Sequence, residues 1–324
     1  MTTSAASATL AETITRNASK QSYLTIKTLV PQERRGDAFR AYAYYRWVDD
    51  LLDGEELNRA QRIEFLASQR QLLSDCLGDH PPRDLCAEEW LLVDLTEGHL
   101  KGDPGLEIYL QDMMDVMAFD VMRRGRRIDS NQLSWYSRRL ATAVTEAVYT
   151  FIGDQCRVPR VVERYVAADA AHIVHMLRDM HEDLEAGYIN IPTDVIPGER
   201  VDPMVLEQEC VKTWVHERVE LARRYFEGGD EYLKSIQNPH CRMAGAWYAT
   251  RFTGVLEAIE RENYLLRRDY SDCKNNRLML RMLWGGMKAA FPIHPTPEIS
   301  LQSTLAPVRE LETKFLYQYE LIEE

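Results

Sequence analysis

Residues 42–53 decide the fold, and they read Tyr-Ala-Tyr-Tyr-Arg-Trp-Val-Asp-Asp-Leu-Leu-Asp. The stretch has strong helix formers, no Gly or Pro before Gly54, and apolar residues at helical rather than alternating spacing. On a helix, Asp49 and Asp53 lie one turn apart on the same face, where like charges repel and slightly destabilise the helix. Mg²⁺, which prefers carboxylates, waters and phosphate oxygens, would reverse that effect. For this pattern taken alone, a solvated acidic helix end is the alternative.

A second stretch, residues 172–183, repeats the arrangement and reads His-Ile-Val-His-Met-Leu-Arg-Asp-Met-His-Glu-Asp. Asp179 and Asp183 are again four residues apart, and His175 lies one turn before Asp179. Two helices that each present such a pair beside an arginine, Arg46 in one and Arg178 in the other, can face each other across a cavity. Metal ions between them could hold a diphosphate. The two stretches together are more specific than either alone.

The two stretches resemble the aspartate-rich motifs of the squalene/phytoene synthase family, and residues 187–192 extend the second motif. The likeness runs from about residue 22 to about residue 283 and includes residues 133–136 and 258–264. The resemblance implies an all-α, single-domain isoprenoid-synthase-type helical bundle around a central cavity. It also implies a Mg²⁺-dependent prenyltransferase that ionises an allylic prenyl diphosphate.

Composition limits the classes of partner. The chain has 324 residues and a net charge of −12, which argues against a broad nucleic-acid surface and against electrostatic docking on anionic lipid. Six scattered cysteines without zinc spacing indicate reduced thiols and a cytoplasmic protein. No apolar run reaches the length of a transmembrane segment, about twenty residues, although transient membrane contact stays open.

Three regions are expected along the chain: a mobile tail over residues 1–15, a catalytic domain over 16–291 and a C-terminal extension over 292–324. The first motif predicts a helix that ends before Gly54. Residues 187–203, with three prolines, predict a loop. Residues 22–29 lead into Pro31. The other helices are expected over residues 59–77, 85–99, 106–124, 129–153, 159–187, 205–226, 230–236, 240–262 and 277–290.

The resemblance also implies a metal site. Its candidate ligands are Asp49, Asp53, Asp179, Asp183 and His175. Members of the family usually have Asn at the position of His175, so this histidine is open to three roles: metal ligand, base for an acceptor, or structural residue. With His172 it also permits a two-His zinc site, for which a third ligand is missing.

Arginines and aromatic residues complete the candidate site. Arg46 and Arg178 are candidates for contacts to diphosphate, and their alternative is an ion pair on the helix surface, with Asp50 and Glu182 respectively. Aromatic rings can stabilise a carbocation, and the alternative for each of them is a place in the core. The aromatic candidates are Tyr42, Tyr45 and Tyr136.

Three departures from the family concern the second substrate. Thr142 and Thr145 occupy positions where the family has small glycines, and Phe252 stands where a tyrosine is frequent. Branched side chains there would narrow or polarise the tunnel for prenyl chains. The departures narrowly favour transfer of a short prenyl group to a non-isoprenoid, small-molecule acceptor, for example an electron-rich aromatic ring.

Three other functions stay open at this point. The first is head-to-head condensation of two allylic diphosphates, as in squalene- and phytoene-type synthases. The second is a terpene cyclase, which quenches the cation within one substrate. The third is a non-catalytic partner subunit, which the four intact aspartates argue against.

Overall fold

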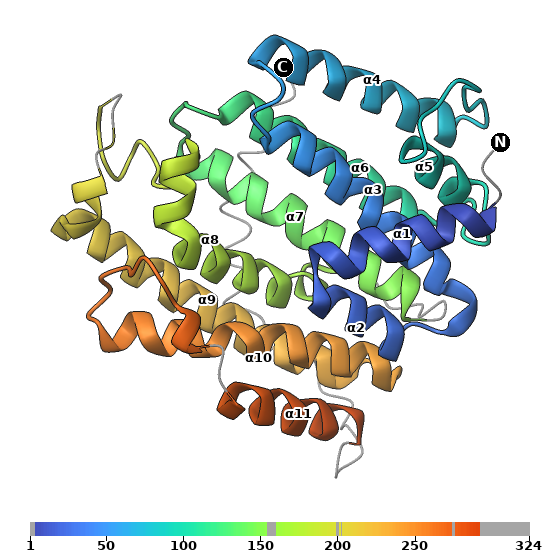
Figure 1. The fold of residues 1–324 in the computed structure, drawn as a ribbon. Coiled ribbons are helices and arrows are strands. Elements are labelled where there is room, and N and C mark those ends of the chain that lie inside the picture. Colours follow the sequence, from blue (N-terminus) through green and yellow to red (C-terminus); the bar gives the residue numbers. More distant parts are fainter. Residues whose placement is uncertain (1–3, 154–159, 199–200, 202, 274–275, 292–324) are drawn as a thin grey trace. The chain divides into compact units, whose positions relative to one another are not determined.

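The computed structural model describes residues 4–153, 160–198, 201, 203–273 and 276–291. Within these residues the secondary structure is helical, with eleven α-helices, four short 3₁₀ helices and one isolated bridge between Arg127 and Ile189 (Figure 1). The all-α prediction is therefore confirmed. No helix in the described ranges is long and apolar enough to cross a membrane.

The chain divides into two compact units, and the division falls within helix α7 (Ser130–Phe151). The first unit contains the described residues of 1–122 and 142–156, and the second those of 123–141 and 157–324. Helices of the first unit are α1 (Ser4–Ala18), α2 (Lys20–Leu29), α3 (Arg35–Asp53), α4 (Arg59–Leu77), α5 (Glu89–Thr96) and nearly all of α6 (Pro104–Arg123). Those of the second unit are α8 (Val166–Ala186), α9 (Glu209–Ser235), α10 (Pro239–Arg261) and α11 (Asn276–Ala290).

Helix α3 is the central element of the first unit, and it packs against α1 and α5. Its apolar face is buried, with Tyr44 and Val48 both fully buried. The Tyr44 hydroxyl donates a hydrogen bond of 3.0 Å to Oε1 of the buried Gln69 in α4. This pairing satisfies two polar groups that would otherwise cost free energy in the core.

The start of the chain differs from its prediction. Instead of a mobile tail over residues 1–15, the structure has α1, which packs on α3. Ser7, Ala11 and Thr15 are fully buried, and Arg40 of α3 donates a 2.9 Å hydrogen bond from Nε to the Ser7 hydroxyl. Small residues four apart let two helices approach closely, so the Ser, Thr and Ala content marks a packing face.

In the second unit, α8 packs against α9 and α10, and α10 packs against α11. Helix α9 is continuous from Glu209 to Ser235, where the sequence predicted two helices with a break near residues 227–229. Gly228 and Gly229 are both buried. A Cβ atom at Gly229 would lie 2.4 Å from the Cβ of Ala167 in α8. Gly229 therefore allows the close approach of α8 and α9.

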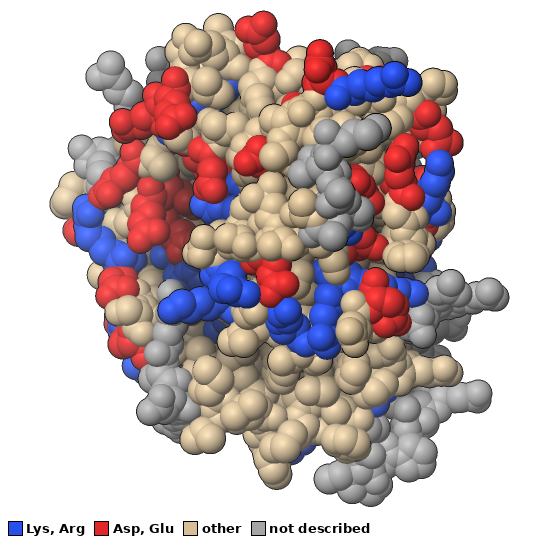
Figure 2. Space-filling model, turned by 45° about the vertical axis from the view of Figure 1, so that its right-hand side comes forward, with Lys and Arg blue, Asp and Glu red and all other residues tan. Residues whose placement is uncertain are grey.

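The outer side of α11 is apolar. Met279, Leu280 and Trp284 are each more than half exposed, with exposed fractions of 59%, 66% and 59%. Figure 2 shows one face of the molecule, on which acidic, basic and uncharged side chains all occur. The described surface thus combines charged regions with an apolar helix face.

Candidate active site

The first aspartate pair lies at the C-terminal end of α3. The helix ends at Asp53 because the N–H of Gly54 bonds the carbonyl oxygen of Asp50 at 3.0 Å and the backbone then leaves helical geometry. Arg46 forms an ion pair with the exposed Asp50, and its Nη1 lies 3.6 Å from Oδ2 of Asp49. The predicted alternative for Arg46, a pair with Asp50, is present, and the guanidinium also lies beside the predicted metal ligand.

The electrostatics of this pair favour a cation. Burial, together with the neighbouring Asp53 carboxylate, raises the pKa of Asp49 to about 7, and the Arg46 charge only partly opposes this. Asp120 of α6 raises it further. Asp120 was not predicted as a site residue from the sequence. The signal that could have pointed to it is the spacing of Asp112 and Asp120, which lie eight residues apart in a second acidic helix. A divalent cation such as Mg²⁺, bound beside Asp49, would stabilise the charged form of this carboxylate.

Asp49→Asn should raise the thermal stability of the metal-free protein, and more so at pH 8 than at pH 5. The unfolded chain ionises Asp49 near its ordinary pKa of 3.8, whereas the folded chain resists ionisation up to about pH 7. Asp49 therefore lowers the free energy of unfolding progressively between these two pH values, and asparagine removes that loss. Because the side chain is 38% exposed, water screens the effect, and a gain of about 1 kcal/mol, or about 1–2 °C, is expected.

The measurement is thermal unfolding in chelator at both pH values, with the exposed Glu56→Gln as the matched control. Added Mg²⁺ should then stabilise the wild type but not Asp49→Asn. An equal or lower melting temperature of Asp49→Asn at pH 8 would contradict the prediction.

The remaining candidates of the first unit differ in burial. Tyr45 is buried and donates its hydroxyl hydrogen bond to the Leu110 carbonyl, so it takes the predicted alternative, a place in the core. Tyr42 is half-buried. In α7, Thr145 is buried and Thr142 is half-buried. Their predicted effect on a tunnel stays a prediction.

The second aspartate pair lies on α8, and Asp179 is held from two sides. Its Oδ2 lies 2.8 Å from Nε2 of His175, and Arg178 donates bonds of 2.5 and 2.6 Å to its two oxygens. Burial alone would raise the pKa of Asp179, but the bonds from His175 and Arg178 outweigh burial and hold the pKa well below its usual range. The alternative predicted for Arg178 was a pair with Glu182, but the guanidinium bonds the adjacent Asp179 carboxylate, which offers a bidentate acceptor.

Asp183 is held by a residue outside the helix. Helix α8 ends at Gly187, whose φ of +89° is a left-handed conformation that suits glycine, and the chain reverses there. The reversal brings Asn190 back to Asp183, where its amide Nδ2 donates a 2.6 Å hydrogen bond to Oδ2. The predicted stop near Gly187 is confirmed. Asn190 was not predicted as a site residue.

Two further candidates of the second unit, Phe252 and His172, are both buried. Phe252 of α10 is buried, and its ring centroid lies 5.9 Å from that of His175. His172 is buried too, with Nε2 3.5 Å from the Tyr248 hydroxyl. Burial, and then the nearby His175, lower the pKa of His172 to about 3, so it is neutral. Arg251, beside Phe252, is a further cation that sequence reasoning missed.

The predicted metal ligands are not gathered into one preformed cluster in the described part of the chain. Within the described ranges there is no group of three or more His, Cys, Asp or Glu side chains that could hold a metal ion, which gives no support to the two-His zinc site. Each helix instead offers a pair of carboxylates. On α8, Asp179 and Asp183 are already hydrogen-bonded to neighbouring side chains.

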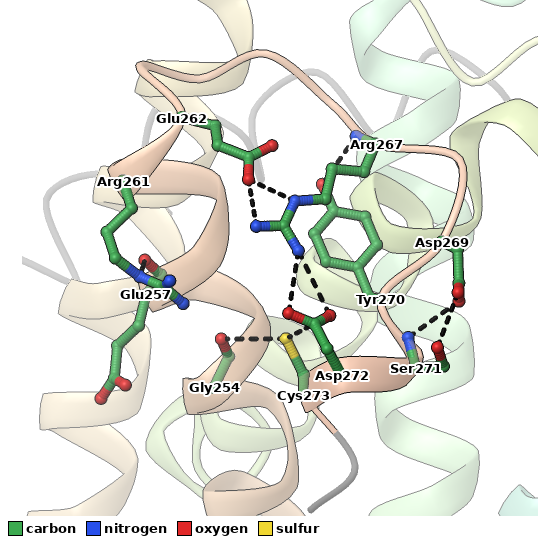
Figure 3. A network of polar contacts seen from close by, with 10 residues as sticks. All are labelled: Gly254, Glu257, Arg261, Glu262, Arg267, Asp269, Tyr270, Ser271, Asp272 and Cys273. Carbon is green, nitrogen blue, oxygen red and sulfur yellow. Dashed lines mark hydrogen bonds and ion pairs between the residues drawn. The ribbon is translucent and has the colours of Figure 1, made fainter.

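The loop between α10 and α11 supports the C-terminal part of α8. Arg268 of this loop lies 2.7 Å from Glu185, and Nε2 of His181 lies 3.3 Å from the Leu266 carbonyl oxygen. The loop is itself held by Arg267, whose guanidinium lies between Glu262 and Asp272, as Figure 3 shows. The second motif is thus positioned by a loop that follows it by some eighty residues.

Comparison with known sequences gives a consistent set of relatives. A family model described as squalene/phytoene synthase matches residues 15–279. A phytoene synthase of Mycobacterium tuberculosis is 27% identical over 187 residues, which are 57% of each chain. A presqualene diphosphate synthase of Rhodopseudomonas palustris is 26% identical over 226 residues, 67% of this chain and 75% of the relative. The chain thus aligns with little more than half the length of the mycobacterial relative.

Comparison with solved structures supports the same fold. A dehydrosqualene synthase in complex with ligand superposes with a TM-score of 0.64 at 18% identity, covering 88% of this chain and 96% of that chain. A squalene synthase from Alicyclobacillus acidocaldarius has a TM-score of 0.65 at 17% identity, covering 81% and 95%. At these identities the likeness shows a shared fold.

Proposed function

Because the chain belongs to the squalene/phytoene synthase family, we propose that it is a Mg²⁺-dependent prenyltransferase that condenses two allylic prenyl diphosphates head to head. One observation carries the proposal. Two helices each present a pair of aspartates four residues apart beside an arginine, in a chain whose relatives are named phytoene synthase and presqualene diphosphate synthase.

The reaction begins with loss of diphosphate. The C–O bond of the donor breaks, and its electron pair leaves with the diphosphate. A bond then forms between the allylic carbon and the double bond of the second substrate, which loses a proton. Mg²⁺ would be held by Asp49, Asp53, Asp179 and Asp183 and would neutralise the charge that develops on the leaving group. Electrostatic catalysis is most effective when the neutralising charge lies at the atoms where charge develops in the transition state.

The other polar residues have supporting roles. Arg46 carries a fixed positive charge beside the first aspartate pair, and Arg178 carries one beside the second. Either can donate bidentate hydrogen bonds to a phosphate. His175 holds Asp179 in place, which makes an orienting role the one that the 2.8 Å contact supports.

The choice of acceptor follows the relatives rather than the tunnel argument. Thr142 and Thr145 narrowly favoured a non-isoprenoid acceptor on the sequence alone. The relatives' names favour the alternative, the coupling of two prenyl diphosphates. A threonine hydroxyl in α7 can also bond a backbone carbonyl of the preceding turn and so need not oppose a hydrocarbon guest.

The decisive experiment is incubation of purified protein and Mg²⁺ with allylic diphosphates of several chain lengths, followed by mass spectrometry of the organic-soluble products. A squalene-, dehydrosqualene- or phytoene-like hydrocarbon, or a cyclopropyl diphosphate intermediate of twice the donor length, is expected from one donor alone. Product that forms only with an added aromatic compound would restore the other acceptor, and a cyclised monomer would indicate a cyclase. Asp53→Asn serves as the inactive control.

A further inference from the structure

In the second unit, a chain of side-chain hydrogen bonds runs from Arg123 through Asn190 to Asp183. We propose that Arg123 and Asn190 are positioning residues, which fix the Asp183 carboxylate in the orientation needed to bind a divalent cation. The inference rests on the proposed function, since it assigns a purpose to residues behind one of its metal-site aspartates.

The contacts in this chain are short; the bond between Arg123 and Asn190 is buried, and that between Asn190 and Asp183 is partly buried. Arg123 donates from Nη1 to Oδ1 of Asn190 at 2.6 Å, and Asn190 donates from Nδ2 to Oδ2 of Asp183 at 2.6 Å. Asn190 is 1% exposed and Arg123 is 7% exposed. Hydrogen bonds in such surroundings are stronger than in water and costly to break.

The chemistry of the three groups sets the direction of the chain. A guanidinium can only donate, and an ionised carboxylate can only accept. The residue between them must therefore present one acceptor and one donor, which an asparagine amide does. This arrangement also fixes the amide orientation of Asn190, so both of its polar ends are used.

Arg123 is itself clamped. Its guanidinium carbon lies 4.6 Å from the ring centroid of Tyr136 and 5.0 Å from that of Tyr188. Planar guanidinium groups stack well on aromatic rings. Tyr136, predicted from the sequence as a ring for the carbocation, thus contacts the arginine of this chain, and its role toward a carbocation stays a prediction. The chain from the tyrosines to Asp183 is a rigid support.

Backbone bonds tie the two segments that carry this support. The N–H of Gly125 bonds the carbonyl oxygen of Gly187 at 2.8 Å, and that of Thr193 bonds the Ile128 carbonyl oxygen at 2.9 Å. Arg127 donates to the Pro192 and Ile196 carbonyl oxygens at 3.0 and 2.8 Å. The loop after α8 therefore holds Asn190 in place.

The support matters because a carboxylate that binds a metal is oriented by its remaining hydrogen bonds. Loss of such an outer contact typically weakens metal binding about 10–100-fold. Leucine at position 190 has a similar volume but neither polar atom, so Asn190→Leu should remove both bonds at once.

The test is Mn²⁺ binding by the full chain in the presence of inorganic diphosphate, measured by electron paramagnetic resonance of the free ion. Asn190→Leu should weaken binding about 10-fold or more, and Arg123→Lys, which keeps a donor and a charge, by less. Arg126→Gln removes an exposed arginine three residues away and should leave binding unchanged. Circular dichroism checks folding, and Asn190→Ala is the second variant if leucine is not accommodated.

A double-mutant cycle separates positioning from a general loss of structure. If Asn190 acts through Asp183, Asn190→Leu should add little to the loss already caused by Asp183→Asn. An equal loss in both backgrounds, wild-type affinity in Asn190→Leu and Asn190→Ala, or equal Mn²⁺ binding by wild type and Asp183→Asn would each overturn the inference. The proposed function is judged separately by product: a wild type that makes product while Asn190→Leu binds Mn²⁺ normally would overturn the positioning role alone.

Discussion

Asp179→Asn should lower turnover by about 10³-fold, with almost unchanged shape of the side chain. Asparagine removes the negative charge that a divalent cation requires and breaks the bidentate bond to Arg178 and the 2.8 Å contact with His175. The developing charge on diphosphate then loses part of its neutralisation in the transition state. Asp53→Asn on α3 should show a loss of the same order, and chelator should stop diphosphate release by the wild type.

The measurement is steady-state release of diphosphate at saturating Mg²⁺, with product formation followed in parallel. Glu182→Gln and Glu56→Gln are the matched controls, because each removes one exposed carboxylate near a motif aspartate. Near wild-type turnover in both aspartate variants, or activity that survives without metal, would show that the aspartates have been assigned the wrong role.

Gly229→Ala should destabilise the protein by about 1–3 kcal/mol, although alanine is the better helix former. The new methyl group would lie 2.4 Å from Cβ and 2.9 Å from Cα of Ala167, far inside van der Waals contact. The backbone of α8 cannot move aside as a flexible side chain would, so α8 and α9 must separate. Since α8 carries the second motif, activity should fall as well.

The matched control is Gly254→Ala in α10. Among the described residues a methyl group there would meet only the Cys273 carbonyl oxygen, at 4.0 Å. Helix propensity should therefore dominate, and stability should stay equal or rise by up to about 1 kcal/mol. Urea unfolding of both variants checks the pair. A Gly229→Ala protein as stable as Gly254→Ala would show that contact between α8 and α9 does not require glycine.

Local patterns predicted the helices well where each helix carries its own signals. Helix α4 begins and ends at the predicted residues, 59 and 77, because Asn58 with Gln61 forms a capping box and Gly78 follows its last turn. Helix α8 stops where Gly187 predicts it. The aspartate pairs could be recognised for the same reason, since a spacing of four residues places two side chains on one helical face.

Contacts between distant segments could not be predicted in this way. The Ser, Thr and Ala content of residues 4–18 is equally compatible with a tail and with a packed helix, and only the surface of α3 decides between them. Gly229 looks like a helix break in the sequence, but it lies in a continuous helix, where its missing side chain leaves room for Ala167, some sixty residues earlier.

The sequence by itself determined most of the helical elements, though not α1 or the continuity of α9, together with the two aspartate pairs and the family. These features depend on neighbours within one or two turns of helix. The tertiary structure alone decided what holds each aspartate: Asp120 near Asp49, and Arg123 through Asn190 at Asp183. These partners come from other helices and loops, and the burial that makes their charges and hydrogen bonds effective exists only once the chain has folded.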